Sequence, residues 1–536
     1  MPFKNNSMDQ IMIDLENSFA GCRSLIDPTA WRGISSGCHH FETLPAFLDS
    51  VQNYIQSTQT PLFLAELARL EWHIWKAKNQ DIEMPASALQ IALNPSLVLL
   101  DLSWVDLTDY LSSAGSSLPH PGQELVLLWK HPKTGDVQSE TASSESLLVL
   151  KMVLENIDAR DVAQTGAIPL VAVRAAVDRT AEKGIIFLPS SRIRRNREVE
   201  EASPYTDEQF QVSSSFTLQL HITQACDLHC RHCYDRSDRS ALMLPEALRI
   251  LEEMDHFCRE RNVSGQVSFT GGNPLLHPDF PAMYQAAADY GFTLNVLGNP
   301  CDEKQIERLQ AIQPLNFFQV SLEGLPEHND YIRGKGHFER TMRFLALLCQ
   351  MNVYSMVMLT LTKDNMDQVI ALGEFLQGKT NAFFFNRLTP VGEGAALALP
   401  SRASYISFLD QYLEAAKRLP VLGYKDNLLN IAMQQQGMAP FGGCTGFGCG
   451  AAFNFLSVLP DGEVHACRKF PSLIGNLKTQ TLAEVCDSEA AERYRNGSEE
   501  CRSCTMNLVC GGCLASTYSH GLNIFKYKDP FCFCRP

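Results

Sequence analysis

The spacing of hydrophobic residues changes along the chain and separates a helical N-terminal region from an alternating central region. Leu64, Leu67 and Leu70 recur at the three-to-four-residue spacing of one helix face. This pattern predicts a helical domain over residues 1–118. From residue 216 onwards, short apolar runs alternate with amphipathic segments. The expected strands are 216–222, 266–270, 292–297, 317–322, 354–361 and 382–386.

This alternation predicts about six β/α units, in which parallel strands lie inside and helices lie outside. We expect residues 216–400 to form an α/β domain, either an open sheet or a partial (β/α)6 TIM-like barrel. Functional side chains of such folds gather at the carboxyl ends of the strands. Residues 401–443 are expected to form a helical bridge, and residues 444–536 a loop-rich region held by cysteines.

Residues 119–188 predict a small module of a different kind. A strand-like run at 125–129, a turn with Pro and Gly at 131–136 and three amphipathic segments indicate a hairpin followed by three helices. This is the outline of a winged-helix module, which binds DNA or captures a peptide as an added strand. Residues 189–215 are polar and serine-rich, which is typical of a linker. Its basic side chains are expected on a solvated face; they are Arg192, Arg194, Arg195 and Arg197.

Composition and charge narrow the classes of partner. The 536 residues suffice for about three domains. A net charge of −15 disfavours a nucleic-acid binder and favours a peptide as the ligand of the winged-helix-like module. The sequence contains no run of about 18 apolar residues, so no membrane-spanning helix is predicted. The N-terminus lacks the apolar core of a signal peptide, so we expect a cytoplasmic protein that binds neither nucleic acid nor membrane.

The 18 cysteines are distributed unevenly. Without a secretion signal, metal or redox chemistry explains such a number better than disulfides do. Three lie within eight residues, and ten lie within the last 93 residues, of which all but Cys486 form a spaced set. The scattered remainder is expected to be small buried hydrophobic residues; these are Cys22, Cys38, Cys258, Cys301, Cys349 and Cys486.

Cys226, Cys230 and Cys233 form a C-x3-C-x2-C run directly after the first central strand. Three close thiolates can hold three irons of a four-iron cluster, which leaves the fourth iron open to a small molecule. A structural zinc ion normally takes four ligands, and His229 or His232 could complete such a set. Zinc therefore remains an alternative at this point.

This run, together with Tyr234, resembles the cluster motif of the radical S-adenosylmethionine (SAM) enzymes. The next strand ends in Gly271, Gly272, Asn273 and Pro274, which resemble the GGEP loop that binds the methionyl amino group in this family. The glycines let the backbone approach a ligand closely. Asn273 replaces the usual glutamate: its amide can accept a hydrogen bond from an ammonium group but brings no charge.

Residues 320–324 (VSLEG) resemble the SLDG segment of the peptide-modifying members of the family, and residues 331–336 (YIRGKG) resemble their RGxG segment. By this resemblance, Ser321 and Arg333 contact the ribose or the carboxylate of SAM. Arg387, in a segment that resembles the end of the family's barrel, is expected to face the site.

The cysteine-rich tail resembles the SPASM extension of radical SAM enzymes, which carries up to two auxiliary four-iron clusters. The resemblance implies one auxiliary cluster on Cys444, Cys449, Cys467 and Cys513. It implies a second on Cys501, Cys504, Cys510 and one of the last two cysteines, of which Cys532 suits the spacing better than Cys534. A zinc ribbon is the alternative for the tail alone.

The resemblance, over residues 216–536, implies an enzyme that cleaves SAM reductively and uses the 5′-deoxyadenosyl radical to abstract hydrogen from a ribosomally made precursor peptide. The chain is most similar to the SPASM peptide maturases, including the selenobiotic-type group. A flavodoxin or ferredoxin is the expected electron donor. Two alternatives share parts of the pattern: a sulfatase-maturase-like enzyme that oxidises a Cys or Ser of a protein, and a winged-helix redox sensor with an iron–sulfur domain.

Overall fold

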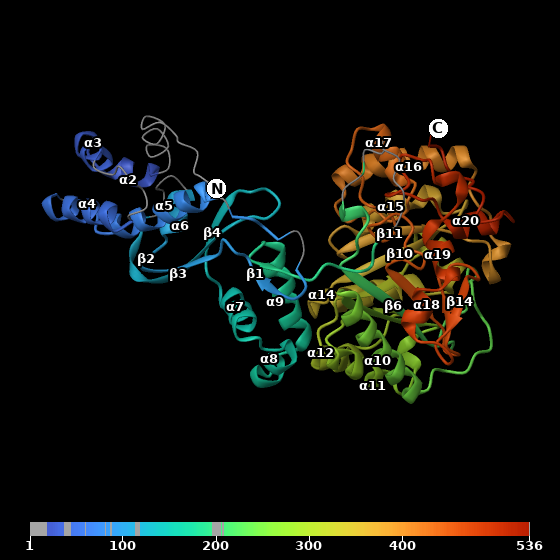
Figure 1. The fold of residues 1–536 in the computed structure, drawn as a ribbon. Coiled ribbons are helices and arrows are strands. Elements are labelled where there is room, and N and C mark those ends of the chain that lie inside the picture. Colours follow the sequence, from blue (N-terminus) through green and yellow to red (C-terminus); the bar gives the residue numbers. More distant parts are fainter. Residues whose placement is uncertain are drawn as a thin grey trace. The chain divides into compact units, whose positions relative to one another are not determined.

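The computed structural model describes residues 19–36, 44–58, 60–80, 82–85, 88–112, 118–195, 205 and 208–534. Contacts divide the chain into two compact units. The N-terminal unit comprises residues 1–168 and 172–190, and the C-terminal unit comprises residues 169–171 and 191–536 (Figure 1). Within the described ranges, no helix is both long and apolar enough to cross a membrane.

The N-terminal unit begins with helices and continues into a three-stranded antiparallel sheet. The helices are α2 (Ala20–Leu25), α3 (Pro28–Ser36), α4 (Leu44–Ser57), α5 (Leu64–Asn79) and α6 (Leu107–Ser112). The strands are β2 (Val98–Val105), β3 (His120–Lys130) and β4 (Val137–Thr141), in the order β2-β3-β4. The expectation of helix throughout 1–118 is wrong at β2, because burial there alternates with the two-residue period of a strand: Leu100 and Leu102 are buried.

The hairpin and three helices expected after residue 119 are present. The helices that follow β3 and β4 are α7 (Ser144–Glu155), α8 (Ala159–Gly166) and α9 (Leu170–Glu182). Ser143 and Asp158 cap the first two of these helices by accepting hydrogen bonds from backbone N–H groups. A short strand, β5 (Ile186–Phe187), then pairs with β1 (Ala92–Leu93) and closes the unit.

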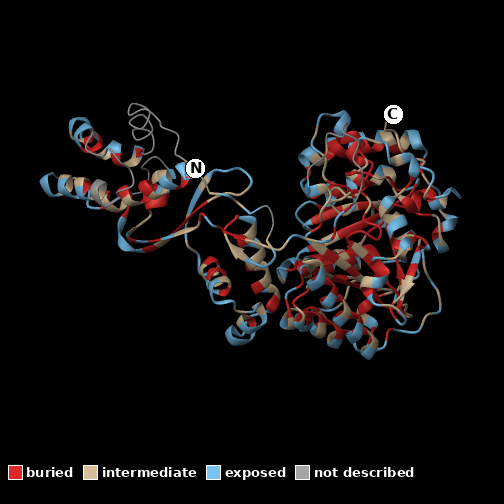
Figure 2. Cartoon of the chain, viewed as in Figure 1, coloured by how far each residue is buried: buried red, intermediate tan, exposed pale blue. Residues whose placement is uncertain are grey.

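A nine-stranded sheet forms the core of the C-terminal unit, in the order β11-β10-β9-β8-β7-β6-β12-β13-β14. Its first six strands are parallel, as expected; they are β6 (Ser215–Thr223), β7 (Ser264–Gly271), β8 (Thr293–Leu297), β9 (Phe317–Ser321), β10 (Ser355–Leu361) and β11 (Ala382–Arg387). Figure 2 shows buried residues concentrated along these strands. The helices between them are α10 (Leu244–Arg261), α11 (Phe280–Asp289), α12 (Glu303–Ile312), α13 (Pro326–Arg333), α14 (His337–Gln350) and α15 (Val369–Leu376).

The cysteine-rich tail continues the same sheet. Strand β12 (Phe455–Val458) pairs in parallel with β6, and β13 (Glu463–His465) and β14 (Leu473–Asn476) follow in antiparallel order. The side chain of Ser457 donates a hydrogen bond of 2.8 Å to Gln219 across the β12–β6 pair. The loop that follows β6 and the cysteine-bearing tail therefore share one rigid frame. The remaining helices are α16 (Arg402–Arg418), α17 (Leu429–Gln435), α18 (Leu482–Cys486), α19 (Glu489–Asn496) and α20 (Leu514–Ser519).

Two smaller expectations need correction. Among the scattered cysteines, Cys22, Cys258 and Cys486 are buried, but Cys301 is only half-buried and Cys349 is exposed. In the basic run, Arg195 is 3% exposed rather than solvated, while Arg192 and Arg194 are exposed. The first 18 residues, Cys38 and Arg197 lie outside the described residues.

Candidate active site and cysteine clusters

The three cysteines of the C-x3-C-x2-C run lie in the loop after β6, at the carboxyl edge of the parallel sheet. Cys226 is exposed, and Cys230 and Cys233 are half-buried. The Cys233 N–H donates to the Cys230 carbonyl at 3.1 Å, which turns the loop back on itself. Burial raises the pKa of the Cys230 thiol, and the positive charge of Arg333 opposes this rise.

The cluster loop, residues 226–234, is fastened to α13. The backbone N–H of Arg231 donates to the Ile332 carbonyl at 3.0 Å. Its side-chain Nε donates to the Tyr331 carbonyl at 2.9 Å, and the guanidinium group lies 4.3 Å from the centre of the Tyr331 ring. These contacts fix the middle of the loop to the end of a helix that packs outside the sheet.

A buried ion pair stands beside Cys230. Arg333 donates from Nε and one terminal nitrogen to Oε1 of Glu323, at 2.8 and 2.6 Å, and its other terminal nitrogen lies 3.7 Å from the Cys230 Sγ. Oε2 of Glu323 accepts the Thr360 N–H at 2.8 Å. Burial alone would raise the pKa of Glu323, but His232, Arg333 and the Thr360 amide together hold it below its usual value. Glu323 is a site residue that the sequence analysis missed.

His232 completes this cluster as a neutral side chain. Its Nε2 lies 3.5 Å from Glu323 and 3.4 Å from Arg333. Burial lowers the pKa of His232 to about 4, so the imidazole is uncharged at neutral pH. Ser321 is the last residue of strand β9 and precedes Glu323 by two residues.

The two glycines of the GGNP loop are required by the backbone that leads from β6 into the cluster loop. Gly271 has a φ of +134°, and a Cβ atom there would lie 2.1 Å from the Thr223 carbonyl oxygen. A Cβ atom on Gly272 would lie 2.3 Å from the Ala225 carbonyl oxygen. Two backbone segments therefore approach each other closely here, and the approach of a ligand to these glycines stays a prediction.

Asn273 is 4% exposed and joins the GGNP loop to the start of the cluster loop. Its Nδ2 donates to Oδ1 of Asp227 at 3.0 Å, and its Oδ1 accepts the Leu275 N–H at 3.3 Å. Asn299, at the end of β8, donates to the same Asp227 oxygen at 2.6 Å and lies 3.5 Å from the Cys226 Sγ. Asp227 is thus a second residue that the sequence analysis did not identify.

The residues after Cys233 connect the cluster loop to the tail. Asp235 forms an ion pair with Arg468, whose guanidinium lies 4.7 Å from the centre of the Tyr234 ring. Arg239 also pairs with Asp235, at 3.3 Å, and reaches Asp461 at 2.7 Å. Since Arg468 directly follows Cys467, one ionic network links the neighbourhoods of two cysteine sets.

Four tail cysteines influence one another electrostatically. Burial raises the pKa of Cys449 to about 11, with added repulsion from Cys513 and Cys444. Burial raises the pKa of Cys467 to about 12, again with repulsion from Cys449 and Cys513. These four cysteines therefore share one neighbourhood, and their assignment to a single auxiliary cluster stays a prediction.

The other five tail cysteines line a second, small pocket. They are Cys501, Cys504, Cys510, Cys532 and Cys534. The sulfurs of Cys504 and Cys534 are 3.7 Å apart. Five thiols thus surround a site for which the resemblance assigns four, and the assignment of Cys532 rather than Cys534 stays a prediction.

Arg387 does not face the cluster loop, contrary to expectation. It is 3% exposed and pairs with Asp426 at 2.7 Å and with Asp529 at 2.6 Å. Asp529 also accepts the Cys513 N–H at 3.0 Å. Arg387 therefore joins the last barrel strand to the cysteine-rich tail.

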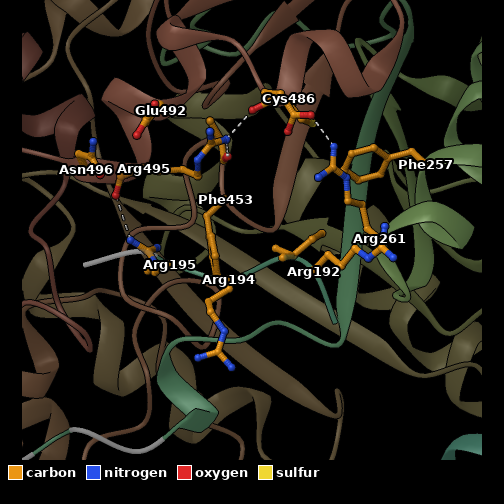
Figure 3. Close-up of a pocket in the computed structure, with 13 residues that line it drawn as sticks. Arg192, Arg194, Arg195, Phe257, Arg261, Phe453, Cys486, Glu492, Arg495 and Asn496 are labelled. Atoms are coloured by element: carbon orange, nitrogen blue, oxygen red, sulfur yellow. Dashed lines mark hydrogen bonds and ion pairs between the residues drawn. The ribbon is translucent and has the colours of Figure 1, made fainter. Parts of the chain in front are cut away.

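A further pocket of about 240 Å³ lies where the start of the linker meets α10 and α19 (Figure 3). Arg195 donates to the carbonyls of Arg495 and Cys449. Arg495 in turn donates to the Cys486 carbonyl at 2.6 Å, and Arg261 pairs with Asp487 at 2.5 Å (Figure 3). These arginines therefore bond the linker, α10 and the tail to one another.

The donor sets suit iron–sulfur clusters. Three thiols share one loop at the carboxyl edge of the barrel, and nine more form two groups in the tail. Fold and cysteine-bearing loops together define an iron–sulfur enzyme on a partial barrel.

Comparisons with known proteins also indicate an iron–sulfur enzyme. Residues 220–376 match the Radical SAM superfamily, and residues 449–505 match SPASM, an iron-sulfur cluster-binding domain. Residues 220–376 and 449–505 thus carry a radical SAM domain and a SPASM domain, and these domains imply SAM, a [4Fe–4S] cluster and auxiliary iron–sulfur clusters. The sequence-based expectations of family, fold class, enzyme and cofactors are confirmed, and the matches favour an enzyme over the redox-sensor alternative.

Three similar proteins illustrate this relationship. The AdoMet-dependent heme synthase of Methanosarcina barkeri is 28% identical over 350 residues, which cover 60% of this chain and 96% of that protein. The mycofactocin maturase MftC of Mycolicibacterium smegmatis is 27% identical over 351 residues, covering 61% of this chain and 86% of that protein. The crystal structure of Streptococcus suis SuiB bound to precursor peptide SuiA matches with a TM-score of 0.51 at 16% identity, covering 76% of this chain and 96% of that chain.

Proposed function

We propose that the chain is a peptide maturase, which uses SAM-derived radical chemistry to modify a ribosomally made precursor peptide. The names of two similar proteins support this proposal: MftC is a maturase, and SuiB is seen bound to a precursor peptide. The observation that carries the peptide substrate is the N-terminal unit. The match to SuiB covers 76% of this chain, which exceeds the C-terminal unit and therefore reaches into the N-terminal one.

The residues of this chain bind the cofactors, orient the substrate and shield the radical from water. Cys226, Cys230 and Cys233 would hold the [4Fe–4S] cluster, which with bound SAM would supply a 5′-deoxyadenosyl radical. The Glu323–Arg333 pair holds the loop beside Cys230. This fixed frame places a target hydrogen near the radical and keeps water away from it.

Further residues of the chain would contact SAM or hold the auxiliary clusters. Tyr234, Gly271, Gly272, Asn273 and Pro274 line the SAM site, with Ser321 and Arg333 toward the ribose or carboxylate. The tail cysteines assigned above would hold the two auxiliary clusters, which would supply an acceptor for the product electron or a site for a substrate thiolate. A flavodoxin or ferredoxin supplies the first electron.

The N-terminal unit offers an edge for the peptide. Within the described residues, β4 pairs only with β3, so its outer backbone groups are free to pair with an added strand. A leader segment bound at this edge would raise the effective concentration of the peptide core at the barrel.

Deletion of residues 1–190 tests the peptide assignment. The truncated protein should lose affinity for the precursor peptide, measured by fluorescence anisotropy of a labelled peptide. It should keep uncoupled SAM cleavage, measured as 5′-deoxyadenosine formation, which also reports that the C-terminal unit is folded. Unchanged peptide affinity in a truncated protein that still cleaves SAM would reject the peptide-capture role of the N-terminal unit.

A second candidate function follows from the relative named a heme synthase. Its match covers 96% of that protein but only 60% of this chain, so about two-fifths of this chain has no counterpart in it. A heme-forming enzyme would not need this additional part. The same truncation separates the two functions, because a heme synthase activity should survive the loss of residues 1–190.

A further inference from the structure

The amide of Asn273 is engaged by neighbouring residues. Its oxygen accepts the Leu275 N–H at 3.3 Å, and its nitrogen donates to Oδ1 of Asp227 at 3.0 Å. The residue is 4% exposed, so the second lone pair of the amide oxygen is poorly accessible to a ligand. A buried and uncharged amide is therefore a weak partner for the amino group of SAM.

A carboxylate stands directly beside this asparagine. Asp227 follows Cys226, and its Oδ1 accepts hydrogen bonds from both Asn273 and Asn299. Asn299 also lies 3.5 Å from the Cys226 Sγ. The Asp227 carboxylate therefore lies close to both the first cluster cysteine and the GGNP loop. The Asp227 side chain is 30% exposed, so one face of it is open.

The second oxygen of Asp227 retains its capacity to accept. The hydrogen bonds from Asn273 and Asn299 both go to Oδ1, and the charged group beside Oδ2 is Arg340, at 3.1 Å. The approaching nitrogen of Arg340 has no hydrogen-bond geometry to any partner, so this contact is an ion pair only. Arg340 offsets the charge of Asp227 without occupying its lone pairs.

We propose that Asp227 receives the methionyl amino group of SAM, in place of the glutamate that the family carries at position 273. The inference rests on the proposed SAM chemistry but not on the peptide substrate. It resolves the missing charge of the GGNP loop, because the negative group has moved from the end of β7 to the residue after Cys226. Asn273 and Asn299 act as positioning residues that fix one oxygen of the carboxylate and aim the other.

The test is a binding selectivity rather than an activity. The full-length protein with reconstituted clusters is titrated, by equilibrium dialysis, with SAM and with an analogue that lacks the α-amino group. Wild-type protein should prefer SAM by about 10- to 100-fold, the usual value of a charge-assisted hydrogen bond. In Asp227→Asn this preference should collapse, because SAM binds more weakly while the analogue binds as before.

Two further variants make the result specific. Asp238→Asn removes an exposed carboxylate shortly after the cluster loop and should leave the preference unchanged. The double variant Asp227→Asn with Asn273→Glu returns the carboxylate to the GGNP loop and should restore the preference. Iron content is measured for each variant, so that loss of the cluster is not mistaken for loss of the amino-group contact.

The contrary outcomes are distinct. If Asp227→Asn weakens SAM and the analogue equally, Asp227 only supports the loop and the inference is wrong. The same holds if the wild-type protein does not discriminate between the two ligands. If the iron-loaded wild-type protein binds no SAM at all, the proposed SAM chemistry fails as well, and the inference with it.

Discussion

Glu323→Gln tests whether a buried ion pair holds the cluster loop in place. Both oxygens of Glu323 accept from donors: one from Arg333 at 2.6 and 2.8 Å, the other from the Thr360 N–H at 2.8 Å. A glutamine offers one oxygen and one NH2 group. Whichever way it turns, a buried donor meets another donor and loses its partner.

The magnitude follows from burial. The side chains of Glu323 and Arg333 are 1% and 11% exposed, so solvent screens the pair weakly. Removing one partner of such a pair costs about 3–5 kcal/mol in the free energy of unfolding. We expect a loss of this size in the C-terminal unit.

The pH dependence provides an independent check of the mechanism. Although burial raises the pKa of Glu323, its partners bring it below the ordinary value. A carboxylate whose pKa is lowered by folding stabilises the protein above its unfolded pKa of about 4.3 and loses this effect as the pH falls through the folded pKa. The difference between wild type and variant should therefore be constant from about pH 6 to 8 and shrink below about pH 4.

Urea unfolding followed by circular dichroism measures this effect. All five tryptophans lie within residues 31–129, so their fluorescence reports on the N-terminal unit and should show an unchanged transition. Glu327→Gln, on the exposed side of α13, is the matched control. An unchanged midpoint for the C-terminal unit of Glu323→Gln, or a difference that persists at low pH, would refute the reasoning.

Two cysteine substitutions separate the roles of the clusters. Cys226→Ala should abolish SAM cleavage, because the SAM-binding cluster loses a ligand; continued 5′-deoxyadenosine formation would contradict the assignment. Cys501→Ala should leave SAM cleavage intact but prevent formation of the modified peptide, as followed by mass spectrometry. Modified peptide from that variant would show that the second auxiliary cluster is dispensable.

The parallel strands could be predicted from the sequence because both of their faces are buried. Each then becomes a short apolar run, and the loops between them carry polar and glycine residues. Strand β2 escaped prediction because its apolar residues alternate over only a few positions beside a long helical region. The pairing of β12 with β6 joins residues 238 positions apart, and no local pattern encodes such a partnership.

The cysteines of the site were recognisable, but the carboxylates that organise it were not. Cys226 and its two companions carry a spacing that defines their chemistry. The roles of Glu323 and Asp227 depend on what other strands bring to them. Two signals were available: Glu323 stands at the acidic position of the segment that resembles SLDG, and the missing charge at Asn273 suggests that another residue supplies it.

Arg387 shows that a sequence pattern can also suggest a ligand-binding role where the structure places a buried ion pair. A basic residue at the carboxyl end of a barrel strand resembles a ligand-binding group, and only the three-dimensional arrangement reveals Asp426 and Asp529 around it. Burying this cation requires both carboxylates. Arg387 therefore supports the junction between the barrel and the tail.

The central claim is a radical SAM enzyme with one open cluster and two auxiliary clusters. Anaerobic iron and sulfide analysis, combined with electron paramagnetic resonance of the reduced protein with and without SAM, tests it most directly. The account predicts about twelve irons per chain and a signal that SAM alters, as expected for three four-iron clusters of which one has an open iron. Zinc in place of iron after anaerobic preparation, or a signal indifferent to SAM, would contradict it.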